Sequence, residues 1–349
     1  MVESQYFLKE IAKNQKDSNF VISPVGLEVL LKVINQEPLS NRLIEFNKGI
    51  DFKKSFEHWV DDFVVILNSK TSVWHQEALE LDESFKNWLT THNEVGVNPR
   101  LPFSKETINE WVKTHSKGLV QGIISEEIDP MTIGMLINVL YFKASWKEFF
   151  YPDFNTEGDF YAEDGTSKKV TFMKKGSLYF PEDFLYNEDD FFGVIQLPYI
   201  KEGLVMELYL PKKGVAMSDF LTHFSTVDMK VFRSNFQMKE CFLELPKFET
   251  QTKLSFDEII ENLGLINTEN LKYFEGYKEQ FVDNILQTTV INVSESDTEA
   301  SSVTRGGIAG GMPYPTENPV IEFILNRPFA YIIRDNKTNT DIFTGIKRR

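Results

Sequence analysis

A series of β-rich segments in the C-terminal part of the chain restricts its fold more than any other feature. The segments are rich in Val, Ile, Phe, Tyr and Thr and are bounded by Gly, Pro, Asn and Asp, which is typical of strands separated by turns. They cover residues 135–146, 192–200, 204–211, 241–250, 284–294, 320–335 and 340–346. Strands in this number predict large sheets.

Upstream of these segments we expect mostly helix. Residues 25–34 have apolar side chains at helical spacing after Ser23-Pro24, and residues 104–125 show a similar spacing. A shorter helix, residues 254–265, interrupts the β-rich part. Helices followed by strands predict an α+β fold built around large sheets.

The chain shows no internal division. We find no repeat, long linker or change in composition, so we expect a single domain over residues 1–349. A hydrophobic content of 42% is sufficient for a large core. The single cysteine, Cys241, excludes an internal disulfide, so stability must come from packing.

Charge and hydropathy exclude several classes of partner. The net charge of −15 argues against nucleic acid or an anionic membrane surface as the main partner. The N-terminus has no apolar run of signal-peptide length, and the longest apolar run, residues 135–142, is too short to cross a bilayer. We expect a cytoplasmic protein, or one secreted without a classical signal peptide. The acceptor patterns at Asn292 and Asn336 leave export open.

We find no enzyme or metal motif in the sequence. The patterns G-x-S-x-G, H-E-x-x-H, G-x-x-x-x-G-K-[ST] and C-x-x-C are absent, and the five histidines do not cluster at ligand spacing. Cys241 alternates with apolar strand residues, which favours a packing thiol over a nucleophile. We therefore expect no enzyme, no cofactor and no metal. An enzyme that uses Cys241 or a histidine–carboxylate pair is the least favoured alternative.

Residues 298–319 combine the patterns of a strand and of a loop. Every second residue in the first half is small or apolar, whereas Glu299 and Arg305 fall between these positions. Glycines and prolines in the same segment favour an exposed loop. The small, uncharged set, which would fit a tight interior, is Thr298, Ala300, Ser302, Thr304, Gly306, Ile308 and Gly310.

Several diagnostic runs occur in a fixed order along the chain. They are NFVISPVGLEVLL (19–31), INEWVKTHSKGLVQGII (108–124), INVLYFKASW (137–146), FNTEGDFYAEDGTSKKVTFM (154–173), LPYIKEGLVMELYLPKKG (197–214), LELPKFETQTKLSFDEIIENLGL (243–265), TTVINVSESDTEASSVT (288–304) and NRPFAYIIRDNKTNTDIFTG (326–345). In these runs and their order the chain resembles the serpins, a family of serine protease inhibitors, over nearly its whole length.

The resemblance implies a fold and a mechanism. The fold has a large mixed β-sheet, additional sheets, an N-terminal helical region and an exposed reactive loop, here at about residues 295–320. A target serine protease cleaves this loop and is trapped as a covalent acyl-enzyme, while the loop inserts as a new central strand of the main sheet. A cysteine protease is the second class of target. The resemblance also implies a monomer.

The resemblance assigns the hinge and the inserting loop to one set of residues: Glu295, Asp297, Thr298, Glu299, Ala300, Ser302 and Thr304. Asp297 stands where the family has a glycine, and glycine adopts unusual backbone angles more readily than Asp. This departure supports the alternative that the chain is a non-inhibitory chaperone or carrier of the same fold.

In the region that the family uses to open the sheet, Ser23 and Asn138 match the usual residues. Gly26 replaces a frequent serine, and Gln287 replaces a frequent histidine. A glutamine can still join strands by hydrogen bonds, without a charge that depends on pH. We find no basic cluster between Ile66 and Asp82, so the resemblance does not extend to heparin-activated members.

The usual spacing from Glu295 places the reactive bond at Gly311-Met312, whereas counting back from the C-terminal signature places it nearer Tyr314. Between Gly306 and Asn326 there is no Lys or Arg. We therefore expect a chymotrypsin-like or elastase-like protease as the target.

Overall fold

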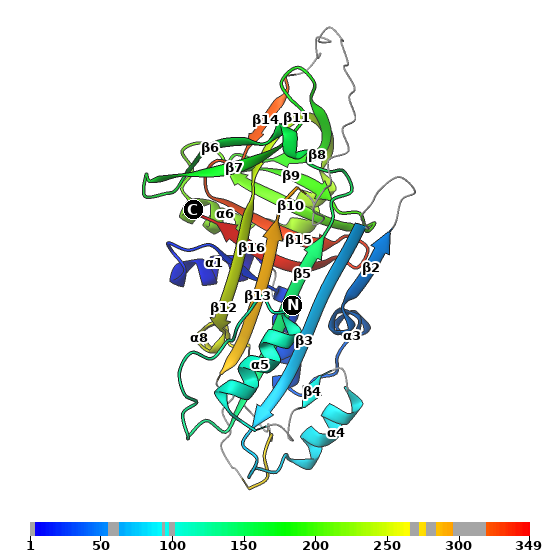
Figure 1. Cartoon of the computed structure of the whole chain (residues 1–349), viewed down its shortest axis with the longest axis vertical. Helices are drawn as coiled ribbons and strands as arrows, with labels where there is room; N and C mark the ends of the chain where they lie inside the picture. The colour runs from blue at the N-terminus through cyan, green and yellow to red at the C-terminus, as the bar shows by residue number, and fades with distance from the viewer. Residues whose placement is uncertain are drawn as a thin grey trace.

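The computed structural model describes residues 4–54, 63–92, 95–97, 102–265, 272–276, 284–295 and 319–349. Its strands form two sheets, with helices packed around them (Figure 1). Among the described residues, no helix is long and apolar enough to span a membrane.

The first sheet, called the main sheet below, has six strands that run along the long axis of the molecule (Figure 1). Its central strands β13 and β5 are parallel, and β12, β3 and β2 pair with their neighbours in antiparallel fashion. The order is β12 (Phe248–Ser255), β13 (Ile285–Val293), β5 (Gly134–Ala144), β3 (Phe63–His75) and β2 (Ile50–Lys54), with β4 (Gly96–Val97) paired to β3.

The second sheet has ten strands and lies across one end of the main sheet (Figure 1). Its order is β1 (Phe20–Ile22), β16 (Thr340–Lys347), β15 (Phe329–Asp335), β10 (Leu204–Pro211), β9 (Phe192–Pro198), β8 (Glu182–Glu188), β11 (Gln237–Pro246), β7 (Ser167–Lys175) and β6 (Thr156–Tyr161), and β14 (Ile321–Ile324) pairs with β11 in parallel. The strand β8 pairs with both β9 and β11, which makes this sheet continuous.

The helices cover the sheets. In the part of the chain that the structure describes, they are α1 (Ser4–Asn14), α2 (Pro24–Ile34), α3 (Asn41–Lys48), α4 (Glu83–Thr91), α5 (Lys105–His115), α6 (Met217–Phe224), α7 (Met229–Ser234) and α8 (Asp257–Asn262), with a 3₁₀ turn η1 (Pro152–Phe154). Helix α2 contacts strands of both sheets. It begins where Ser23 accepts a hydrogen bond from the Gly26 N–H, with Pro24 at the first helical position.

Helix α5 lies on one face of the main sheet (Figure 1). Its buried residues Ile108 and Val112 belong to one apolar cluster with Ile137 and Val139 of β5 and Val290 of β13. The helix therefore packs on β5 and β3, and its apolar cluster extends to β13.

The predicted α+β architecture is confirmed, and the predicted helix at 25–34 is α2. The predicted helix at 104–125 is too long, because α5 ends at His115 and the chain then turns through Lys117 and Gly118 at positive φ. The expectation of a mostly helical N-terminal part is wrong for Phe63–His75, which forms β3. This strand pairs with β5 along its length, and its second half is buried at successive positions, as expected for an interior strand.

Candidate functional site

The centre of the main sheet is closed. Strands β5 and β13 pair directly from Ile285 with Leu136 to Ile291 with Phe142, and none of the described strands lies between them. Strand β13 ends at Val293, next to the point at which the reactive loop was predicted to begin. The main sheet is therefore arranged as a loop-insertion mechanism requires before insertion.

The three predicted sheet-opening residues lie in contact at this centre. Gln287 of β13 accepts a hydrogen bond from the Ser23 N–H (2.8 Å) and donates to the Ser23 carbonyl (3.2 Å) and to Asn138 Oδ1 of β5 (3.0 Å). Asn138 in turn donates to Thr71 Oγ1 of β3 (3.0 Å). All four residues are buried. One uncharged network, called the central bridge below, thus joins β13, β5, β3 and the start of α2.

The central bridge explains why residue 26 is a glycine and not the serine that is frequent in the family. A Cβ atom on Gly26 would lie 2.5 Å from Asn138 Oδ1 and 2.9 Å from Gln287 Nε2, too close for either pair of atoms. A serine at this position would require both amides to move. The glycine at 26 is therefore compatible with the glutamine at 287. In the sequence, these two departures from the family pattern showed no connection.

The end of β13 is held by a second, charged set of contacts, called the hinge clamp below. The Glu295 carboxylate is 2.7 Å from the Lys247 ammonium and accepts a hydrogen bond from the Asn155 side chain. The Trp146 indole N–H donates to the Ser294 carbonyl (2.8 Å). Glu295 is only 8% exposed. These contacts fix the last described residues before the predicted loop.

The hinge clamp perturbs the ionisation of Glu295. Burial by itself would raise the pKa of this carboxyl group, but the hydrogen bonds from Lys247 and Asn155 and the nearby ammonium charge outweigh burial. The pKa of Glu295 is consequently below its ordinary value. The clamp is therefore charged at neutral pH.

Trp146 is rigidly placed for its role in the clamp. Its ring stacks on Tyr199 with centroids 4.4 Å apart and an interplanar angle of 9°, and it meets Phe150 edge-on at 6.0 Å. The side chain is 3% exposed. Trp146 is a buried core residue, and nothing in the sequence around it indicates its contact with the hinge.

The remaining predicted site residues lie outside the described part of the chain, so their roles stay predictions. They are Asp297, Thr298, Glu299, Ala300, Ser302, Thr304, Gly311 and Met312. Lys247 and Asn155 were not predicted as site residues. Both occur in the diagnostic runs, but nothing in those runs indicates that they meet at Glu295.

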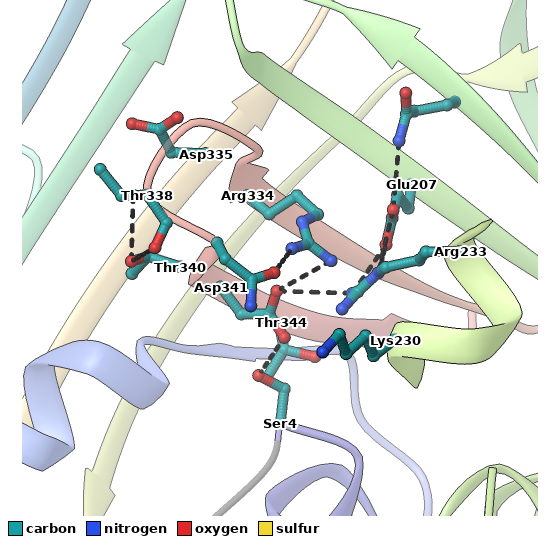
Figure 2. A network of polar contacts seen from close by, with 12 residues as sticks. Ser4, Glu207, Lys230, Arg233, Arg334, Asp335, Thr338, Thr340, Asp341 and Thr344 are labelled. Atoms are coloured by element: carbon teal, nitrogen blue, oxygen red, sulfur yellow. Dashed lines mark hydrogen bonds and ion pairs between the residues drawn. The ribbon is translucent and has the colours of Figure 1, made fainter. Parts of the chain in front are cut away.

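Buried charges also occur in the second sheet, away from the hinge. Figure 2 shows Glu207 of β10 facing Arg233 of α7, with their side chains 2.8 Å apart, and Arg233 lies 3.4 Å from Asp341 of β16. Ser4 of α1 donates to the same aspartate at 2.8 Å. Glu207 is fully buried and its charge is compensated, so this network fastens α1 and α7 to the sheet and offers no reactive group.

Cys241 lies inside the second sheet and is fully buried. Burial raises the pKa of its thiol to about 12, so the thiol is protonated at neutral pH. The predicted packing thiol is confirmed. Within the described ranges, no group of His, Cys, Asp and Glu side chains is arranged to hold a metal ion.

Comparison with known proteins agrees with this geometry. The model of the family Serpin (serine protease inhibitor) matches residues 4–347. The chain therefore belongs to the serpin family.

Individual relatives are distant but cover the whole fold. The chain is 27% identical to plasminogen activator inhibitor 1 of Neovison vison, over 97% of this chain and 88% of the relative. It is 28% identical to glia-derived nexin of Rattus norvegicus, over 96% and 89%. The crystal structure of the thermophilic serpin tengpin in the native state aligns with a TM-score of 0.77 at 23% identity, over 99% of this chain and 93% of tengpin.

Proposed function

We propose that this chain inhibits a serine protease by presenting residues 295–320 as bait and inserting the cleaved loop between β5 and β13. The observation that carries the proposal is the direct parallel pairing of these two strands, with the predicted loop following the end of one of them. Relatives with matching length are named as protease inhibitors, which supports the general activity.

Strand directions favour insertion at this position. A loop that turns back from the end of β13 and enters the gap would run antiparallel to both β13 and β5. One parallel pairing would be replaced by two antiparallel ones, which are slightly more stable per residue. Residues 298–310 would reach roughly 40 Å as a strand. This length suits a sheet whose longest strand, β3, has 13 residues.

The target that we propose is a chymotrypsin-like or elastase-like serine protease. This rests on the absence of Lys and Arg between Gly306 and Asn326, because trypsin-like enzymes require a basic residue at the cut. Cleavage at Arg305 would leave too short a strand for full insertion. A papain-like cysteine protease is the second class to test.

The test is formation of an SDS-resistant complex between the full chain and chymotrypsin, elastase, trypsin or papain. We expect a complex with chymotrypsin or elastase, and none when the catalytic serine has been blocked beforehand. Cleavage of the loop by every protease without a complex would contradict inhibition and support a non-inhibitory carrier or chaperone.

A matched pair of variants tests insertion itself. Thr298→Arg would place an unpaired guanidinium on the inward face of the inserted strand, so the chain should be cleaved as a substrate without trapping the protease. Ser301→Arg, on the outward face, should still trap it. Equal trapping by both variants would show that the loop does not insert with this alternation.

A further inference from the structure

A cavity of about 330 Å³ lies beside the hinge clamp, where the residues that follow β5 meet strands of the second sheet. Seven of its twelve lining residues are apolar, among them Trp146, Phe150, Phe184, Leu197 and Pro198, and the other five are polar or charged. Volumes of this size accommodate small organic molecules, and apolar walls with few polar groups are typical of their sites.

One buried cation lines this cavity. Lys175 of β7 is 7% exposed, and burial lowers its pKa. Its ammonium donates to the Phe149 carbonyl (2.9 Å), lies 5.1 Å from the Phe150 ring centroid, and is 3.7 Å from the nearest Glu182 oxygen. An ammonium has three donors, so the Phe149 carbonyl and the Glu182 carboxylate leave one donor for a further acceptor.

Exposed apolar residues and exposed charged residues also line the cavity. Leu185 and Met238 are cross-strand partners on β8 and β11, and they are 36% and 58% exposed although apolar. Lys147, Glu148 and Asp183 also line the cavity but are exposed to solvent. The two carboxylates would repel a second negative group on a ligand.

We propose that this cavity binds an amphiphilic monoanion, a molecule with a flat apolar body and one carboxylate or sulfonate group. The apolar body packs between Trp146, Phe150 and Phe184. The acidic group accepts a charge-assisted hydrogen bond from Lys175, which is stronger than a neutral one.

The cavity is connected to the hinge through one side chain. Trp146 lines it and also donates to the Ser294 carbonyl beside Glu295. A molecule packed on the indole would stabilise the closed arrangement and slow loop insertion. This consequence rests on the proposed function, whereas binding itself does not.

The probe for the test is 8-anilinonaphthalene-1-sulfonate, titrated into the full chain and followed by fluorescence. Its neutral counterpart, N-phenyl-1-naphthylamine, has the same rings without the sulfonate. We expect one sulfonate probe per chain, and Lys175→Met should weaken its binding by about tenfold while leaving the neutral probe unaffected. Melting curves check that each variant is folded.

Two further variants locate the site. Lys174→Met is the control, because Lys174 is the next residue along β7 but pairs with Glu244 (2.8 Å), and it should change neither probe. Met238→Trp should fill part of the cavity and weaken both probes. The proposal is overturned if Lys175→Met weakens both probes equally, or if Met238→Trp weakens neither.

The rate of complex formation with chymotrypsin, measured with and without the sulfonate probe, tests the connection to the hinge. We expect a slower rate with the probe bound, and an unchanged rate would overturn that connection. Probe binding with the expected variant pattern, but no complex with any protease, would refute the proposed inhibition and retain the binding site.

Discussion

The central bridge and the hinge clamp hold the same strand, β13, by different physical means. The bridge consists of buried, uncharged amide contacts around Gln287, so it depends on geometry and is insensitive to pH and salt. The clamp is an ion pair and its neighbours at Glu295, and Lys247 remains partly exposed to solvent. The strand is therefore fastened strongly near its start, at Gln287, and adjustably just beyond its end, where the predicted loop begins.

The largest expected effect comes from cleaving the predicted loop, because its insertion would separate β13 from β5. Cleavage between Arg305 and Thr316 should raise the thermal midpoint well beyond the few degrees that about 1 kcal/mol gives a chain of this size, because an inserted strand adds pairing on both sides. The measurement is calorimetry of the intact and cleaved chains. An unchanged midpoint after clean cleavage would favour the non-inhibitory alternative.

Removal of the central bridge should be the most destabilising single change. Gln287→Ala removes the acceptor of the Ser23 N–H and the donor to Asn138 Oδ1, both buried, at a cost of about 3 kcal/mol in the free energy of unfolding. Urea unfolding measures this cost, with the exposed Gln251 on neighbouring β12 changed to Ala as the control. Equal effects of the two changes would mean that the bridge does not stabilise the sheet.

A smaller loss should follow from crowding the bridge. Gly26→Ala would gain about 1 kcal/mol from helix propensity, yet the close approach to Asn138 and Gln287 should give a net loss of about 2 kcal/mol. Gly96→Ala is the comparison, because its Cβ would meet the Thr71 carbonyl at an ordinary 3.6 Å. A Gly26→Ala chain more stable than the wild type would show that the amides move at little cost.

The hinge clamp should have the smallest effect and a distinct pH dependence. Lys247→Met should cost about 1 kcal/mol at neutral pH. Because the folded-state pKa of Glu295 is lowered, its contribution is fully present above the unfolded-state value and is lost as pH falls through the folded-state value.

Urea unfolding at a series of pH values checks this sign. The difference between Lys247→Met and the wild type should shrink in acid, whereas the Gln287→Ala difference should stay constant. A clamp contribution that grows in acid would contradict the assigned ionisation of Glu295.

The sequence was sufficient for the fold and for the residues at the centre of the main sheet, but not for their partners. Ser23, Asn138 and Gln287 were predicted because they fall at positions that the family uses. Their hydrogen bonds join segments far apart in the chain, and neither periodicity nor composition contains information about such contacts. The compatibility of Gly26 with Gln287 became visible only when the space around Gly26 was known.

The hinge clamp likewise contains contacts that the sequence alone could not predict. Glu295 was predicted, but Lys247, Asn155 and Trp146 reach it from three other segments of the chain.

Strand β3 was missed for a local reason. Alternation of polar and apolar residues is the main signal for a strand, and the second half of β3 is buried without it.

The position of α5 affects the timing of the proposed mechanism. Its buried residues belong to one apolar cluster with Val139 of β5 and Val290 of β13, the two strands between which a new one would enter. One added strand would move its neighbours apart by about 4.8 Å, so this cluster would have to open while the acyl-enzyme is still intact. The strength of this packing would therefore set the rate of insertion relative to the rate of acyl-bond hydrolysis. If insertion is faster, the protease is trapped. If hydrolysis is faster, the protease is released and the chain is left cleaved.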